Sequence, residues 1–258
     1  MKRVTATEHP VTTRPPANRR PRSRVLLALG AIAVLASVGT AFAASIGVSS
    51  EDVTVNMVTA GSGAPTVYAW DDFERTVSPL QGSNAPSTNL WKPGVGNWLT
   101  NGTTAQASSS NADANTLIDA PGVDASLVVT ITAGGGNPTP GVTFNDDGID
   151  NMLLLYTKAA GGTLTLYTYF GPTRVFLAAA TGIGPRGTPF ELRVTSLGPV
   201  ITVFVNGTQV MTQTLAGANL CKFKDSGCPP NGGANVGFGL WADTDTASTF
   251  NDFRIESA

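Results

Sequence analysis

The chain has 258 residues and a single histidine, His9, so nearly all of it lacks an imidazole for catalysis or for binding a metal ion. Seven of the 16 basic residues fall within the first 24 positions, and residues 44–258 carry nine basic and seventeen acidic residues, a net charge of −8. Because nucleic acids are bound through basic surfaces, we expect no nucleic-acid partner.

The first 43 residues have the order of a secretory signal peptide. The basic start is followed by Val25–Ala43, which carries no charge and ends in the small-x-small pattern Ala41-Phe42-Ala43, as expected for a peptide that is cut after Ala43. A run of this length is also long enough for a membrane anchor helix, so residues 25–43 stay in the membrane if the leader is not cleaved. In both cases the basic flank stays in the cytoplasm, and we predict that the rest is secreted or lies at the cell surface.

The remainder is predicted to be a linker, residues 44–65, followed by one all-β domain, residues 66–258. Short alternating or apolar runs recur in this domain, separated by many of the 29 glycines and 17 prolines, and this spacing is typical of an antiparallel sandwich or barrel. The long polar segment from Val77 to Thr116 is expected to hold one or two edge strands. In chain order the predicted strands are Thr66–Phe73, Thr103–Ala107, Ser126–Ala133, Gly141–Asn145, Met152–Lys158, Thr163–Phe170, Thr173–Ala179, three strands within Pro189–Leu215, Asn235–Ala242 and Thr249–Glu256.

The clearest strand pattern lies in Pro189–Leu215. Apolar residues alternate with polar ones from Phe190 to Val194, and again from Ile201 to Val205, so one face of each strand is expected to be buried. Asn206-Gly207 supplies two residues that accept positive φ, as a two-residue hairpin turn requires. This stretch is therefore predicted to form three consecutive antiparallel strands. By contrast, Met152–Tyr156 is apolar on both faces and is expected in the middle of a sheet.

The order of short motifs along the domain resembles the concanavalin A-like lectin/glucanase superfamily, which includes laminin-G-like domains. These motifs are Asp71-Asp72-Phe73-Glu74-Arg75, Gly96-Asn97-Trp98, Gly141-Val142-Thr143-Phe144, Asn151-Met152-Leu153-Leu154, Val236-Gly237-Phe238-Gly239-Leu240 and Phe250-Asn251-Asp252-Phe253-Arg254-Ile255. The resemblance implies a two-sheet antiparallel jelly-roll sandwich that binds ligands on a concave sheet face or on rim loops. It also implies that the first and last strands lie close together, near Asp72 and Asp252.

The resemblance leaves the activity open, because the fold serves lectins, binding modules, glucanases and lyases. Retaining glucanases of this fold carry Glu-x-Asp-x-x-Glu, and the four glutamates after the leader, Glu51, Glu74, Glu191 and Glu256, do not form that motif. Two groups of aspartates, Asp146-Asp147 with Asp150 and Asp243 with Asp245, are weaker candidates for acid catalysis. We therefore interpret the protein as an exported, non-catalytic binding module for a polysaccharide or a cell-surface glycan. The alternatives are a glycoside hydrolase or lyase of the same fold, and a structural surface or matrix protein.

Candidate ligand-binding residues lie on two neighbouring predicted strands. Thr165, Tyr167 and Tyr169 share one face of the first strand, and Arg174 and Phe176 share a face of the next. Aromatic faces beside hydrogen-bonding groups suit sugar rings, so Tyr167, Tyr169, Arg174 and Phe176 are predicted to form part of a glycan platform. The alternative is that these side chains only cover a sheet or pack under a loop.

Two groups of aspartates could bind calcium, which prefers six to eight oxygen ligands. Asp146, Asp147 and Asp150 lie in one polar segment, although the same residues suit a turn between two strands. Asp72 and Asp252 form a second candidate, which rests on the resemblance alone. No other cofactor is expected.

The chain has two cysteines, Cys221 and Cys228. In an exported protein they are expected to form a disulfide bond. A zinc site is not favoured, because no histidine lies near them.

Overall fold

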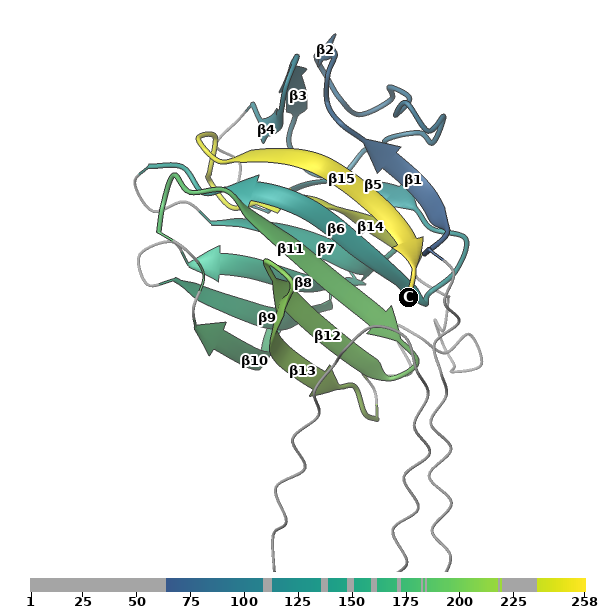
Figure 1. Cartoon of the computed structure of the whole chain (residues 1–258), viewed down its shortest axis with the longest axis vertical. Helices are drawn as coiled ribbons and strands as arrows, with labels where there is room; N and C mark the ends of the chain where they lie inside the picture. Colours follow the sequence, from purple (N-terminus) through teal and green to yellow (C-terminus); the bar gives the residue numbers. More distant parts are fainter. Residues whose placement is uncertain are drawn as a thin grey trace, which may run out of the picture. The chain divides into compact units, whose positions relative to one another are not determined.

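The computed structural model describes residues 64–108, 113–135, 139–147, 151–158, 162–170, 173–181, 183, 185–217, 219 and 236–258 (Figure 1). These residues belong to a compact unit that spans Thr59–Ala258. The predicted leader, residues 1–43, lies outside the described residues, as do Asp150, Cys221 and Cys228. Within the described ranges, no helix is both long enough and apolar enough to cross a membrane.

The larger of two sheets has nine strands. Eight follow the order β13-β12-β11-β6-β15-β4-β3-β2, and β1 pairs with β15 beside this path. Their bounds are β1 (Val67–Asp71), β2 (Thr76–Val77), β3 (Trp98–Asn101), β4 (Ala105–Ala107), β6 (Ala125–Thr132), β11 (Phe190–Leu197), β12 (Val200–Val205), β13 (Thr208–Thr214) and β15 (Thr249–Ser257). All of the pairings in this sheet are antiparallel.

The smaller sheet has six antiparallel strands in the order β10-β9-β8-β7-β14-β5. Their bounds are β5 (Ala114–Asp119), β7 (Pro140–Asp146), β8 (Asn151–Lys158), β9 (Thr163–Phe170), β10 (Thr173–Thr181) and β14 (Gly237–Ala242). It forms a second layer behind the larger sheet in Figure 1. Apolar side chains from both sheets, among them Phe144, Leu153, Leu192 and Phe250, form one core with no solvent exposure. The predicted two-sheet antiparallel sandwich is confirmed.

The predicted consecutive strands in Pro189–Leu215 are confirmed as β11, β12 and β13. Burial alternates at every residue of β12 and along β11 up to Ser196, because side chains of a strand point to opposite faces. Asn206 and Gly207 have φ values of 49° and 74°, the positive values that a type I′ hairpin turn needs. These three strands form one end of the larger sheet.

The first and last strands are neighbours, as the resemblance implied. In the ladder between β1 and β15, Asp71 lies opposite Phe253. The carboxylate of Asp71 is fully buried, and it accepts hydrogen bonds from Arg75 at 2.5 and 2.7 Å and from Trp91 Nε1 at 2.7 Å. A buried carboxylate is stable only with such partners, so this group of contacts joins the start of the domain to its core.

Three strands, β2, β3 and β5, are absent from the predicted list. The polar segment from Val77 to Thr116 contains the end of β2, all of β3 and β4 and the start of β5, and β2 and β5 lie at the edges of their sheets. The strand β5 was not predicted, because Ala114 and Asn115 have weak strand propensity. It forms because it pairs with β14 along its full length, and Leu117 and Ile118 become buried there.

The apolar strand β8 lies in the middle of its sheet, as predicted, between β7 and β9. Leu153 and Leu155 point into the core between the sheets, whereas Leu154 and Tyr156 belong to a separate buried cluster. Because alternate side chains of a strand point to opposite faces, this second cluster lies on the outer face of the smaller sheet. That face carries the candidate site.

Candidate functional site

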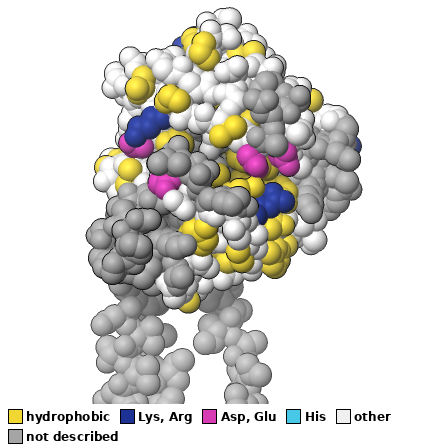
Figure 2. Space-filling view, turned by 180° about the vertical axis from the view of Figure 1, so that it is seen from behind, with side chains coloured by type: hydrophobic (Ala, Val, Ile, Leu, Met, Phe, Trp, Pro, Cys, Tyr) yellow, Lys and Arg dark blue, Asp and Glu magenta, His cyan; other side chains and the backbone are white. Residues whose placement is uncertain are grey.

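Four aromatic side chains from three strands meet on the outer face of the smaller sheet. Tyr156 comes from β8, Tyr167 and Tyr169 come from β9, and Trp241 comes from β14. We call these four residues the aromatic cluster. Seen from the side opposite to that of Figure 1, acidic, basic and hydrophobic side chains lie together near the middle of this face (Figure 2).

A glycine between two strands brings the rings together. In the sheet, Gly141 of β7 lies opposite Tyr156 on one side and opposite Trp241 on the other. Because Gly141 has no side chain, the rings of Tyr156 and Trp241 reach each other above it, with centroids 5.3 Å apart. A Cβ atom at position 141 would lie 2.7 Å from the Cβ of Tyr156, so a larger residue there would displace the tyrosine.

The rings of Tyr156 and Tyr167 stack on each other. Their centroids are 5.4 Å apart and their planes differ by 7°. The ring of Phe176 meets Tyr167 edge to face at 5.8 Å, and its side chain is 56% exposed. The three rings form a continuous row from β8 to the edge strand β10, in which Tyr156 is buried, Tyr167 is half-buried and Phe176 is exposed.

The guanidinium of Arg174 lies over three tyrosine rings. Its central carbon is 5.4 Å from the ring centroid of Tyr156, 4.8 Å from that of Tyr167 and 6.0 Å from that of Tyr169. These distances are within the range of cation–π attraction. Arg174 itself is exposed to solvent, so it covers the cluster from the outside.

Two carboxylates lie beside these rings. Asp113 comes directly before β5 and Asp243 directly after β14, and the adjoining residues Ala114 and Ala242 pair with each other. The hydroxyl of Tyr169 donates a hydrogen bond of 3.2 Å to Asp113 Oδ1. Burial raises the pKa of Asp243, and the negative charge of Asp113 adds to this effect, whereas Arg174 opposes it. The two acids therefore share one electrostatic environment with the cation.

Tyr156 and Tyr169 keep their protons at neutral pH. Burial, together with a hydrogen bond to Tyr167, raises the pKa of Tyr156 to about 12. Burial also raises the pKa of Tyr169, and the Asp113 carboxylate contributes to this rise. The site thus offers neutral hydroxyl groups as hydrogen-bond donors and acceptors.

Two buried polar atoms on this face lack a hydrogen-bond partner. Within the described part of the chain, neither Trp241 Nε1 nor Thr143 Oγ1 has one, although both residues are fully buried. A buried polar group without a partner destabilises a protein by about 1–3 kcal/mol. Such groups are available to hydrogen-bond a ligand that reaches them.

The structure brings together all four residues that the sequence suggested for ligand binding. Tyr167, Tyr169, Arg174 and Phe176 lie on one face, on the neighbouring strands β9 and β10. Sequence reasoning missed Tyr156, Trp241 and Asp113 as members of the site, and it named Asp243 only in a pair with Asp245. The one available signal was that Tyr156 and Trp241 each directly follow an apolar strand residue, Leu155 and Leu240. Because alternate side chains of a strand point to opposite faces, both rings then lie on the outer face.

No protein-family model and no curated protein matches the chain. Among solved structures, a mutant of the GH43 protein BlXynB from Bacillus licheniformis matches with a TM-score of 0.54 and 11% identity, over 73% of this chain and 39% of that chain. The fold is a two-sheet antiparallel jelly-roll sandwich.

Two further structures resemble this jelly roll at lower scores. The carbohydrate binding module CBM66 from Bacillus subtilis has a TM-score of 0.47 and 16% identity, over 74% of this chain and 97% of that one. The β-agarase A from Zobellia galactanivorans has a TM-score of 0.48 and 12% identity, over 74% of this chain and 90% of that one.

The predicted calcium residues of the jelly roll have other contacts. Asp147 accepts hydrogen bonds from the backbone and side chain of Asn151, at 3.1 and 2.5 Å, as a turn between β7 and β8 requires. Asp146 is buried at the end of β7. Asp72 accepts a bond from the backbone of Glu74, and Asp252 accepts one from Thr130. Among the described residues, no three Asp, Glu, His or Cys side chains gather in a way that could hold a metal ion.

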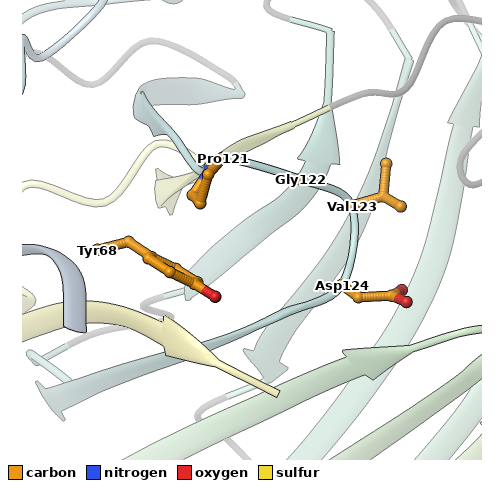
Figure 3. A pocket seen from close by; sticks show the side chains of 5 residues that line it. All are labelled: Tyr68, Pro121, Gly122, Val123 and Asp124. Carbon is orange, nitrogen blue, oxygen red and sulfur yellow. The ribbon is translucent and has the colours of Figure 1, made fainter. Parts of the chain in front are cut away.

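A hollow lies in another part of the jelly roll, beside β1. It is an open depression of about 370 Å³ lined by Tyr68, Pro121, Gly122, Val123 and Asp124 (Figure 3). Asp124 Oδ1 accepts a 3.0 Å hydrogen bond from the backbone of Gly198, so this carboxylate is engaged in the scaffold. The depression has one aromatic ring and lacks the convergent polar groups of the aromatic cluster.

Proposed function

We propose that the protein is an exported, non-catalytic module that binds a polysaccharide or a cell-surface glycan on the outer face of the smaller sheet. One observation supports this proposal most strongly, namely that the half-buried ring of Tyr167 and the exposed ring of Phe176 lie in contact on this face. The C–H face of a sugar ring packs on such rings, while sugar hydroxyls need directional hydrogen bonds. The tyrosine hydroxyls of the aromatic cluster are suited to provide them.

Export is part of the same proposal. It rests on the basic start, the uncharged run Val25–Ala43 and the cleavage pattern at Ala43. Mass spectrometry of protein collected from the culture medium tests it, and a mature chain that begins after Ala43 is the expected result. A product that keeps residues 25–43 and stays with the membrane would instead identify an anchor.

A second candidate function, glycoside hydrolysis, is favoured by one observation. Asp113 and Asp243 interact electrostatically, and Asp243 has a raised pKa. Glycosidases of both stereochemical classes use two carboxyl groups, one of which must stay protonated. The chain lacks the glucanase motif of this fold, and we therefore rank hydrolysis below binding.

A panel of polysaccharides separates these two functions. Each polysaccharide is incubated with the purified protein, and both the retention of the protein and the release of reducing ends are measured. Retention without new reducing ends is the expected result for a binding module. Reducing ends that disappear in both Asp113→Asn and Asp243→Asn would establish the hydrolase instead.

A further inference from the structure

We propose that the aromatic cluster is a cage for a cationic group, and that its ligand is a glycan with free amino groups, such as a polymer of glucosamine. This inference rests on the proposed glycan-binding function and specifies its substrate class. Its basis is the way in which the site already holds a cation of its own, the guanidinium of Arg174.

The rings and charges around Arg174 all favour a positive group. The faces of aromatic rings are electronegative and attract cations, and three tyrosine faces lie within 6.0 Å of the guanidinium carbon. Asp113 and Asp243 add two carboxylates to the same site. With Arg174 as the single basic side chain that acts on these described groups, the site has an excess of negative charge. An acidic glycan is therefore disfavoured.

Arg174 is held in a way that allows a ligand to replace it. Among the described residues, no carboxylate lies within ion-pair distance of Arg174, in contrast to Arg75, which Asp71 binds through both of its oxygens. Arg174 also lies on the edge strand β10 and is exposed. An arginine stem is flexible enough to move away, so the ammonium of an amino sugar can take the position of the guanidinium over the rings.

The rest of an amino sugar suits the remaining groups of the site. Its ring carries a C–H face that can pack on the exposed ring of Phe176, which touches Tyr167. Its hydroxyl groups can form hydrogen bonds with the hydroxyl of Tyr169, which is half-buried and donates to Asp113. The site thus provides separate places for the charge, the apolar face and the hydroxyl groups of one sugar.

Three matched tetrasaccharides test this inference. Oligomers of glucosamine, N-acetylglucosamine and glucose with the same β-1,4 linkage differ at carbon 2 alone, where they carry an ammonium, an acetamide or a hydroxyl group. Affinities are measured by calorimetry at a mildly acidic pH that keeps the amines protonated. We expect the glucosamine tetramer to bind about tenfold more tightly than the other two, as one desolvated cation–π contact implies, and this advantage should shrink as salt is added.

Arg174→Met provides the second test, since it keeps the unbranched stem of the side chain and removes the charged guanidinium. If the ligand replaces Arg174, this variant should bind the glucosamine tetramer several-fold more tightly than the wild type does. The control is Lys92→Met, which removes another cation at the same sheet, one that pairs with Asp119. This control should leave all three affinities unchanged.

The outcomes distinguish the inference from the function on which it rests. Equal affinity for the charged and the neutral tetramers, or weaker binding of the glucosamine tetramer by Arg174→Met, would overturn the cation cage and leave glycan binding in place. Equal binding of tetralysine and the glucosamine tetramer would overturn the assignment of the cage to a glycan. The absence of binding to every sugar, in the wild type and in Arg174→Met, would contradict the proposed function itself.

Discussion

Replacing Tyr167 by alanine should weaken both the fold and glycan binding, because this ring is the centre of the aromatic cluster. Its ring centroid lies 5.4 Å from that of Tyr156, 5.8 Å from that of Phe176 and 4.8 Å from the guanidinium carbon of Arg174. Each aromatic pair contributes about 0.5–1.5 kcal/mol, and an exposed cation–π contact contributes about 0.5–1 kcal/mol. The sum predicts that Tyr167→Ala lowers the free energy of unfolding by about 1.5–4 kcal/mol.

The effect on binding follows from the same contacts. An aromatic residue at the centre of a binding surface commonly contributes about 2 kcal/mol or more, which corresponds to a roughly 30-fold increase in Kd. Urea unfolding measures the stability of the variant, and calorimetry with the best ligand of the polysaccharide panel measures its affinity. Tyr167→Phe keeps the ring and should retain most of the stability.

The matched control is Tyr68→Ala. The chain has four tyrosines, and Tyr68 is half-buried, like Tyr167, but lies on β1 outside the aromatic cluster. This control should bind the ligand as the wild type does. A folded Tyr167→Ala protein with wild-type affinity would refute the assignment of this face as the binding site.

Three further predictions concern the scaffold and the charges of the site. Asp71→Ala removes the buried partner of Arg75 and Trp91 and should lower the free energy of unfolding by about 3–5 kcal/mol in urea titrations; a loss below 1 kcal/mol would contradict the role of these contacts. The folded protein raises the pKa of Asp243 above its ordinary value of 3.8, so the ionisation of Asp243 destabilises the fold as pH rises. Asp243→Asn should therefore match the melting temperature of the wild type at low pH and exceed it at neutral pH. A difference in melting temperature that is constant with pH would argue against this. Gly141→Val should displace the ring of Tyr156 from that of Trp241. The phenolate absorbance of Tyr156, expected near pH 12 in the wild type, should then appear at lower pH. An unchanged titration would show that position 141 does not determine the packing of the aromatic cluster.

Much of the fold follows from local pattern, because strands with one buried face alternate in sequence. The hairpins of β11, β12 and β13 could be predicted because burial alternates with period two and Asn206-Gly207 specifies the turn. The strand β9 has the bounds that were predicted, Thr163–Phe170. By contrast, β5 could not be predicted, since its formation depends on pairing with β14, more than 100 residues later in the chain.

The candidate site also has residues that could be predicted from local pattern and residues that could not. Tyr167, Tyr169, Arg174 and Phe176 could be grouped from the sequence, because they alternate along two adjacent strands. Tyr156 and Trp241 join them only because β8, β7 and β14 pair in a register that puts Gly141 between the two rings. The sequence does not encode that register locally. Asp113 was missed for the same reason, since its contact with Tyr169 joins positions 56 residues apart.

The most direct test of glycan binding by the aromatic cluster compares the wild type with the Tyr156→Ala/Tyr167→Ala double variant on the polysaccharide panel. Near-ultraviolet circular dichroism first establishes that the variant is folded. The proposal predicts that at least one polysaccharide retains the wild type, and that the double variant passes through without retention. Equal retention of both proteins, or no retention of the wild type by any polysaccharide, would contradict it.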